Sequence, residues 1–380
     1  MLRSLTVARE ACERFHPGLL AALEDLTLTE REAEGSPVIE IYRRHNGPGL
    51  LVPASYAGGE ASPLEAVRVQ RALSALSPSL GIATAMHHFT VAMLFALAET
   101  ADRLTPAQVK VLSGIAADGL LLASGWAEGR TDQNILLPSV TAELTPEGYR
   151  VNGSKKPCSL SSAMDVLTAS VAVTDADGNG ALALLLIPGN SPGITTRPFW
   201  ASPVLAAAQS HEVLLDNVLV PEELAITSTP DDADRLDDLQ QSGFLWFELL
   251  ASATYTGAAS TLVNAVFEAG RGDAQSRAAL ATKLDAAIAL LEGTARAVEA
   301  GLSGDEAVAS VLVARYAGQD LLAATVDLAA EMLGGIAFIK SFDVAYLASA
   351  VRALAFHPPS RASVATQLDE YFQGQQLRLQ

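Results

Sequence analysis

A lone acidic residue in an apolar stretch is the first candidate for chemistry in this sequence. Glu248 lies within Phe244–Ala251, where all of the remaining residues are hydrophobic. A carboxyl group in apolar surroundings has a raised pKa, which suits a general base. The same pattern also fits a salt-bridge partner, or a surface residue whose charged head reaches water. We predict Glu248 as a catalytic residue, with these two structural roles left open.

Histidines form the second set of candidates. His357 directly precedes Pro358 and Pro359, which make its segment rigid. An imidazole there can hydrogen-bond a reacting group, or it can simply be part of a stiff loop. His87 and His88 are neighbours in a predicted helix, where successive side chains point about 100° apart. They therefore do not form a shared metal site, and at most one of them faces a pocket.

Two consecutive glycines, Gly334 and Gly335, follow a helical pattern late in the chain. Backbone without a Cβ can approach a phosphate group closely. A glycine pair after a helix is also an ordinary helix stop. The residues alone leave both interpretations open.

Bulk composition narrows the class of protein. The chain has 25 Lys and Arg against 43 Asp and Glu, a formal net charge of −18. With no basic stripe, this charge argues against a nucleic-acid partner. Cys12 and Cys158 make neither a disulfide framework nor a metal-binding spacing, so no metal is expected. The first residues do not form an apolar secretion segment and no apolar run would span a bilayer, so we expect a soluble, cytoplasmic protein without a membrane partner.

The elements that must position these residues fall into three parts. Residues 8–118 have apolar residues at helical spacing, and residues 141–220 alternate in short runs typical of strands. Pro221 opens an expected polar linker, rich in aspartate from Asp231 to Asp238. After Gly243 four helical stretches return, with lengths that suit a bundle, at 244–270, 275–303, 305–333 and 343–356. We predict an α+β, mostly α fold. Its parts are an N-terminal helical domain (1–118), a small β-barrel or sandwich domain (119–226) and a C-terminal four-helix-bundle domain (227–380).

This order of elements, together with four motifs, resembles the acyl-CoA dehydrogenase family. Glu331–Phe338 resembles the glycine-pair motif that closes on the FAD of a neighbouring subunit. Asn152–Ser159 resembles the G-x-K-x-W-I-T strand, although Pro157 replaces its aromatic residue. Ser210–Pro221 resembles the strand with a V-x-V-P exit that ends the family's β domain. Ser124–Asp132 matches the T-E-P-x-x-G-S-D motif poorly.

Covering roughly residues 40–372, the resemblance implies a bound flavin, FAD in preference to FMN, and a homodimer or homotetramer. It also implies an acyl thioester substrate lying against the flavin. Ser159 falls on a hydroxyl position of the family, although a turn serine would look the same. The cofactor contacts expected from the resemblance are Gly125, Thr131, Cys158, Ser159, Gly334, Gly335 and Ser360.

The family's usual loop glutamate is missing. Counting without gaps from the glycine pair puts Pro358 in its place, and proline cannot accept a proton. A second family pattern places the base on the first helix of the C-terminal bundle, where Glu248 falls one residue late, or about 100° of helix. Flavin monooxygenases on this scaffold often carry a histidine-proline element in this loop. That likeness gives His357 a place beside an oxygenated flavin.

Two enzymatic functions follow from these residues. We expect FAD-dependent α,β-dehydrogenation of an acyl thioester, on CoA or a carrier protein, with Glu248 as the base and the electron acceptor left open. The alternative is a flavin-dependent monooxygenase that uses reduced flavin and O₂, with His357 near the cofactor. A non-catalytic relative would have lost the flavin. The dehydrogenase is preferred because the scaffold is more often used that way, which is an argument by analogy.

Overall fold

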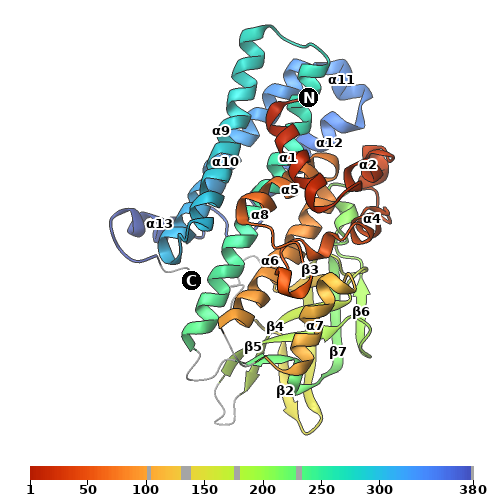
Figure 1. The fold of residues 1–380 in the computed structure, drawn as a ribbon, viewed down its shortest axis with the longest axis vertical. Helices are drawn as coiled ribbons and strands as arrows, with labels where there is room; N and C mark the ends of the chain where they lie inside the picture. Colours follow the sequence, from red (N-terminus) through yellow and green to blue (C-terminus); the bar gives the residue numbers. More distant parts are fainter. Residues whose placement is uncertain (101–103, 130–137, 175–179, 228–232, 378–380) are drawn as a thin grey trace.

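The computed structural model shows an elongated molecule, with a sheet at its lower end in Figure 1 and a helical bundle at the other. It describes residues 1–100, 104–129, 138–174, 180–227 and 233–377. Helix α8 (Ala233–Glu268) runs along the molecule from the sheet into the bundle. Residues along α8 therefore link the two parts.

Seven α-helices build the described N-terminal part. Their ends follow from local capping. The Ser62 hydroxyl accepts from the Glu65 N–H and the Glu65 carboxylate accepts from the Ser62 N–H, which starts α5. Thr105 and Gln108 start α7 in the same way. The helices are α1 (Arg3–Phe15), α2 (Leu19–Glu24), α3 (Leu28–Glu32), α4 (Val38–Arg44), α5 (Pro63–Leu76), α6 (Pro78–Thr100) and α7 (Pro106–Ala117), with 3-10 turns η1 (Gly47–Gly49) and η2 (Ala54–Tyr56) between α4 and α5.

Helix α6 is the core helix of this part. The expectation that no apolar run is long enough to span a bilayer is wrong for its segment Pro78–Ala98, which is long and apolar enough, yet 83% of the tested window is buried inside the protein. A helix that is packed on all sides must be hydrophobic all round. Because α6 packs against α5 and α8, its composition is explained by its place in the core.

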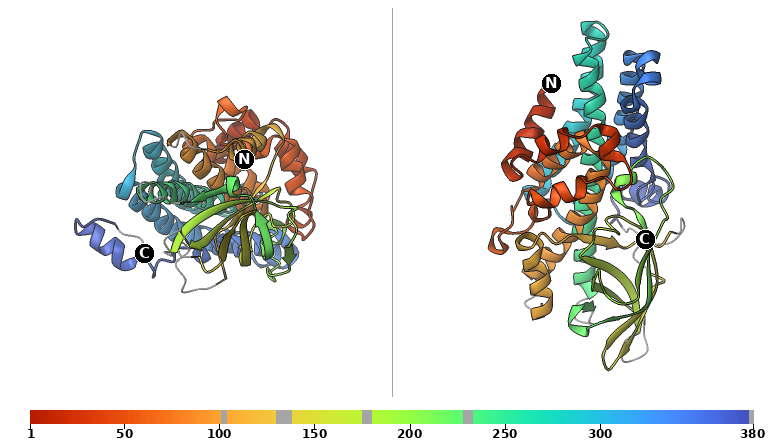
Figure 2. Two further views of the ribbon diagram at one scale, coloured as in Figure 1. Left: turned by 90° about the horizontal axis from the view of Figure 1, so that it is seen from below. Right: turned by 90° about the vertical axis from the view of Figure 1, so that its right-hand side faces the viewer.

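The described strands form one eight-stranded sheet, which is curved in every view (Figures 1 and 2). The order is β6-β7-β3-β2-β4-β5-β8, and β1 pairs parallel to β4. The β3–β7 pair is antiparallel, with register shifts between Val151 and Gly153 and between Lys155 and Cys158. Such bulges increase the local twist. The strands are β1 (Leu122–Gly125), β2 (Thr141–Thr145), β3 (Gly148–Cys158), β4 (Val166–Thr174), β5 (Gly180–Pro188), β6 (Ile194–Arg197), β7 (His211–Val220) and β8 (Ala225–Thr227).

The C-terminal bundle consists of α8, α9, α10 and α12, which pack against one another. Helix α13 lies apart from them in Figure 1 and is held to α10 by a small apolar cluster that includes Leu312, Val364 and Leu368. The remaining elements are α9 (Ala274–Glu299), α10 (Gly304–Leu333), α11 (Gly335–Lys340), α12 (Phe342–Arg352), η5 (Ala353–Phe356) and α13 (Ala365–Phe372), and the 3-10 turns η3 (Ala206–Ala208) and η4 (Glu222–Leu224) flank β7.

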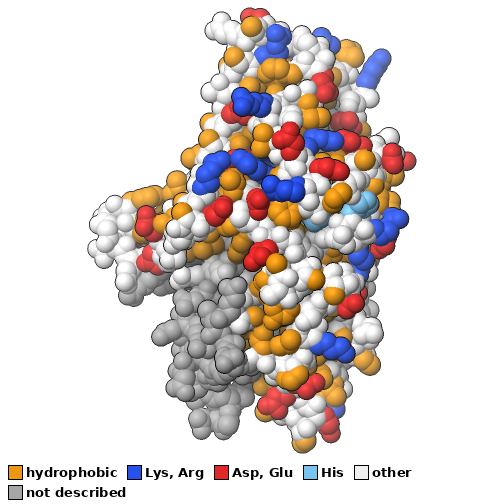
Figure 3. Space-filling view, in the orientation of Figure 1, with side chains coloured by type: hydrophobic (Ala, Val, Ile, Leu, Met, Phe, Trp, Pro, Cys, Tyr) orange, Lys and Arg blue, Asp and Glu red, His pale blue; other side chains and the backbone are white. Residues whose placement is uncertain are grey.

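The surface carries both signs of charge. Figure 3 shows Lys and Arg side chains interspersed with Asp and Glu over the helical part of one face. The net charge of −18 is therefore not gathered into a single acidic field on the coloured part of this face.

The predicted fold class is confirmed: the chain is mostly helical, with a central sheet and a C-terminal bundle. Bounds differ in places. Helix α8 begins at Ala233, inside the aspartate-rich stretch expected to be a linker, since acidic residues suit the first turns of a helix. The division into domains at 118/119 and 226/227 stays a prediction.

Candidate functional site

Glu248 and Arg315 form an ion pair inside the C-terminal bundle. Arg315 Nη1 on α10 donates to Glu248 Oε1 on α8 at 2.7 Å, and both side chains are almost completely buried. Charges buried this deeply require a partner. Of the three roles predicted for Glu248, the structure shows the salt-bridge role, and the catalytic role stays a prediction.

Glu248 also keeps one unpaired oxygen. Its Oε2 atom is buried and has no hydrogen-bond partner among the described residues. Burial raises the pKa of Glu248 to about 7, although the Arg315 guanidinium opposes this shift. A carboxyl group with such a pKa and a free oxygen can exchange a proton near neutral pH.

Arg315 holds the loop that follows α12 by its main chain. Its guanidinium donates to the carbonyl oxygens of Leu354 at 3.3 Å and Pro358 at 3.1 Å, and also to that of His357. These acceptors belong to the backbone. Arg315 of α10 therefore helps to fix the path of the loop's main chain.

Two more residues of α10 continue this anchoring. The Tyr316 hydroxyl donates to the Pro359 carbonyl at 3.0 Å, and Arg361 donates to the Asp320 carboxylate at 2.9 and 3.1 Å. Ser360, a predicted cofactor contact, lies between Pro359 and Arg361 and is exposed. Its hydroxyl accepts a hydrogen bond from the backbone N–H three residues later at 3.1 Å. The structure thus places Ser360 in a turn of the same loop, and its cofactor role stays a prediction.

The ring of His357 lies among aromatic side chains of two helices. The Tyr255 hydroxyl is 2.5 Å from His357 Nε2, and the Phe247 ring lies edge-on with its centroid 5.9 Å away. Phe89 of α6 continues the group, 5.7 Å from Phe247. Burial of the imidazole, together with the Arg315 guanidinium, lowers the pKa of His357 to about 3. The ring is therefore neutral at physiological pH.

A second group of predicted residues gathers where β1 lies beside β3. Gly125 is the last residue of β1, and the Cys158 thiol at the end of β3 donates to the Ser124 carbonyl at 3.4 Å. The hydroxyls of Ser159 and Ser210 are 2.9 Å apart. The structure brings Gly125, Cys158 and Ser159 into one region, and their role in binding a cofactor stays a prediction.

Trp126, which sequence reasoning missed, lies in this second group. Its Nε1 atom is buried without a hydrogen-bond partner among the described residues, whereas buried donors are normally paired. Ala127 accepts from the Lys156 N–H at 2.8 Å, so the segment runs beside β3. A flavin ring offers carbonyl and ring-nitrogen acceptors, so an unpaired donor here fits that cofactor. Thr131, expected nearby, lies outside the described residues.

Gly334 and Gly335 lie away from the chain's own packing. Gly334 ends α10 with φ 85°, which favours glycine, and Gly335 begins α11. A Cβ at either position would meet nothing within 4 Å. The structure shows the helix stop, and the approach to a phosphate stays a prediction.

Both histidines of α6 are core residues. His87 Nε2 donates to the Pro48 carbonyl at 3.0 Å, and its Nδ1 accepts from the Leu122 N–H at 3.0 Å. His88 Nε2 is 2.5 Å from the Tyr42 hydroxyl. These hydrogen bonds join α6 to α4, to η1 and to β1.

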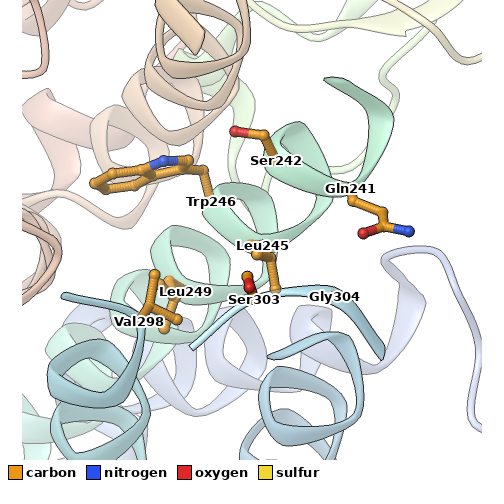
Figure 4. A pocket seen from close by; sticks show the side chains of 8 residues that line it. All are labelled: Gln241, Ser242, Leu245, Trp246, Leu249, Val298, Ser303 and Gly304. Carbon is orange, nitrogen blue, oxygen red and sulfur yellow. The ribbon is translucent and has the colours of Figure 1, made fainter. Parts of the chain in front are cut away.

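A hollow of about 520 Å³ opens between α8, α9 and the start of α10 (Figure 4). It is lined by one face of α8, including Gln241, Leu245 and Leu249, whose spacing of four follows the helix. None of its described lining residues titrates, and Glu248 on α8 pairs with Arg315 instead. The catalytic roles of His357 and Glu248 stay predictions.

Known proteins share both the sequence and the fold. The chain is 57% identical over 378 residues to isobutylamine N-hydroxylase of Streptomyces viridifaciens, covering 100% of each chain. No family profile matches it. KijD3 in complex with FMN and a dTDP-amino sugar aligns with a TM-score of 0.83 at 18% identity, over 97% of this chain and 94% of that one. XiaF from Streptomyces sp., in complex with FADH2 and glycerol, aligns with a TM-score of 0.78 at 20% identity, over 99% of this chain and 97% of that one.

Proposed function

The chain belongs to the family of isobutylamine N-hydroxylase, and from this premise we propose that it is a flavin-dependent monooxygenase that hydroxylates the nitrogen of a small primary aliphatic amine. The observation that carries the proposal is the 57% identity over the full length of both chains. The proposed reaction is the one in the relative's name, and the proposed substrates are the wider class of small primary aliphatic amines.

The expected dehydrogenation of an acyl thioester is wrong, because the full-length relative is named for the hydroxylation of an amine. The site gives a physical reason. Pro358, which cannot accept a proton, stands where the usual loop base would be. The comparison favours the monooxygenase alternative, which depended on the missing glutamate and on His357.

A flavin is the cofactor we infer. Its support is the unpaired Trp126 donor in the segment that runs beside β3, and the fold shared with proteins solved with FMN or FADH2. We propose FAD in preference to FMN, because the exposed backbone at Gly334 and Gly335 offers a place for a second phosphate. Trp126, Gly125, Cys158 and Ser159 would hold the ring system.

The reaction needs one reductant and one oxidant. With reduced flavin bound, it takes two electrons from the cofactor, puts one oxygen atom of O₂ on the amine nitrogen and releases the other as water. The nitrogen attacks through its lone pair, so an alkylammonium ion must first lose a proton. Such ions resemble a lysine side chain, with a pKa of about 10.4.

The chain's own polar groups suit this chemistry. His357 is held neutral in a fixed loop, where it can hydrogen-bond an oxygen atom on which charge develops. Glu248 has a free buried oxygen and a pKa of about 7. We propose that Glu248 balances Arg315 and receives the amine proton, and that aromatic rings such as Phe247 and Phe89 enclose the alkyl chain.

A homodimer or homotetramer is the assembly we propose. Helix α11 exposes large apolar side chains that no described residue covers, with Ile336 at 68% and Ile339 at 77% exposure. Surfaces of this kind on soluble proteins mark contacts with other chains. A second copy of the chain seated on α11 would also bring the glycine pair to its cofactor.

The test supplies purified protein with reduced FMN or FAD, O₂ and isobutylamine, and detects the N-hydroxylamine by mass. With ¹⁸O₂ the product gains one labelled atom. His357→Ala should lower the rate about 100-fold, whereas Thr145→Ala, at the end of strand β2, serves as the matched control. Oxidation of the flavin with every small amine left intact would contradict the proposal.

A further inference from the structure

We propose that Tyr255 is a positioning residue that sets which nitrogen of His357 carries the hydrogen: its hydroxyl donates to Nε2, so that Nδ1–H is the free donor of the ring. The assignment of the hydrogen stands on geometry alone. Its catalytic consequence rests on the proposed function.

Tyr255 and His357 meet at close range inside the bundle. Tyr255 lies on α8 two helical turns after Glu248, on the same side of the helix, and is completely buried. Its hydroxyl oxygen is 2.5 Å from His357 Nε2, and the two ring centroids are 5.5 Å apart. A separation this short is a hydrogen bond, with one hydrogen between the two atoms.

The direction of this bond follows from the number of donors. A tyrosine hydroxyl has one hydrogen, and a neutral imidazole has one N–H and one acceptor nitrogen. Among the described residues, His357 Nε2 is the hydrogen-bond partner of the Tyr255 hydroxyl. If Nε2 carried the hydrogen, the hydroxyl hydrogen would be buried without an acceptor, which is costly. Tyr255 therefore donates, and Nδ1 carries the hydrogen of His357.

The surroundings keep both groups neutral, as this direction requires. Burial raises the pKa of Tyr255 well above its ordinary value of 10, and burial with Arg315 lowers the pKa of His357 to about 3. The titratable groups around the loop are Tyr255 and Glu248 from α8 and Arg315 and Tyr316 from α10. The Arg315 guanidinium disfavours a positive charge on the ring, and Glu248 is paired with Arg315 and not with the ring.

The ring and its backbone are held from different helices. Arg315 of α10 binds the His357 carbonyl, and Tyr255 of α8 binds the ring. A 180° flip of the ring would put Cε1 in the place of Nε2 and lose the Tyr255 bond. For amine hydroxylation, this supplies an uncharged donor, which can stabilise negative charge on an oxygen atom without repelling a cationic substrate.

The experiment uses the full chain labelled with ¹⁵N-histidine, and long-range ¹H–¹⁵N spectra, which distinguish the two neutral forms of imidazole. His357→Asn assigns the signal. We expect the Nδ1–H form in the wild type from pH 6 to 8, and a return towards the Nε2–H form in Tyr255→Phe. With the amine and reduced flavin, the rate of Tyr255→Phe should fall about tenfold.

Tyr316→Phe is the matched control, because it removes a hydroxyl bond from the same loop but not from the ring. Its His357 signal should keep the Nδ1–H form. An Nε2–H form in the wild type, or an unchanged form in Tyr255→Phe, overturns the inference. If Tyr255→Phe does not fold, the wild-type spectrum alone still decides. An Nδ1–H form in a protein that hydroxylates no amine would refute the proposed function and leave this inference standing.

Discussion

At the scale of single residues, Arg315 makes two sets of contacts, one with Glu248 and one with the loop carbonyls. Its replacement should therefore lower the stability of the fold. Arg315→Met leaves Glu248 buried without a partner, and the carbonyls of three loop residues without a donor. We expect the free energy of unfolding to fall by about 3–5 kcal/mol in urea titrations. The loss should be smaller at pH 5 than at pH 8, because the buried carboxyl can take up a proton at the lower pH.

The double variant Glu248→Leu/Arg315→Met separates the two sets of contacts. Replacing a buried ion pair with apolar residues is often neutral. Here the loop carbonyls would still lack their donor, so we expect the double variant to recover only part of the lost stability. Full recovery would show that Arg315 serves Glu248 alone.

His87 should make the protein sensitive to acid. Burial lowers its pKa from 6.5 to about 4, and its Nδ1 must stay unprotonated to accept from the Leu122 N–H. Between these pH values the unfolded chain binds a proton that the folded chain does not. Stability is therefore present above about pH 6.5 and lost as the pH falls towards 4, by roughly 3 kcal/mol.

His87→Gln tests this pH dependence, because an amide can donate to Pro48 and accept from Leu122 without titrating. Unfolding curves at pH 7 and pH 5 should lie closer together for the variant than for the wild type. His16 and His357 also have lowered pKa values and remain in both proteins, so the difference isolates His87. Equal spacing of the two pairs of curves would contradict the assignment.

The sequence indicated which residues were chemically unusual but not what they contact. The apolar stretch around Glu248 left both a buried and a surface position open, and the structure shows that the side chain is buried. Its partner Arg315 lies 67 positions away on another helix, so no local pattern could reveal it. The spacing of seven between Glu248 and Tyr255 was readable as one helix face. The hydrogen bond between Tyr255 and His357 could not be foreseen, because it depends on where the loop places His357.

Helix α11 carries the prediction at the scale of elements. If a second copy of the chain covers it, Ile339→Asp should dissociate the assembly without unfolding the protomer, because Ile339 is 77% exposed in the single chain. Light scattering after size exclusion measures the mass. Leu144→Asp on β2, also exposed at 52%, is the matched control and should leave the mass unchanged. A wild-type protomer mass, or an intact oligomer in Ile339→Asp, would contradict the proposal.

Long elements were predictable and short ones were not. The periodic stretches corresponding to α9 and α10 were expected at 275–303 and 305–333, within a few residues of their observed bounds. Strands β1, β6 and β8 have only three or four residues, too few to show alternation. Their pairing partners in the sheet define them, and those partners are distant in sequence.

Cofactor binding should stabilise the molecule as a whole. A flavin that binds only the folded chain adds about 2.7 kcal/mol at 100 times its dissociation constant, seen as a higher melting temperature. Trp126→Phe removes the unpaired donor and should weaken flavin binding about tenfold. Trp200→Phe is the control, since its Nε1 already donates to Val204 at 2.8 Å. Equal affinity in both variants would remove Trp126 from the cofactor site.

The main-chain grip of Arg315 on the loop has an evolutionary consequence. Because the guanidinium contacts carbonyl groups, which every amino acid carries, mutations at loop positions other than His357 and Arg361 can alter the side chains and leave the loop's path intact. Lineages could thus explore new substrates by exchanging loop residues one at a time. The arginine itself, and the glutamate that neutralises it, should be the last to vary.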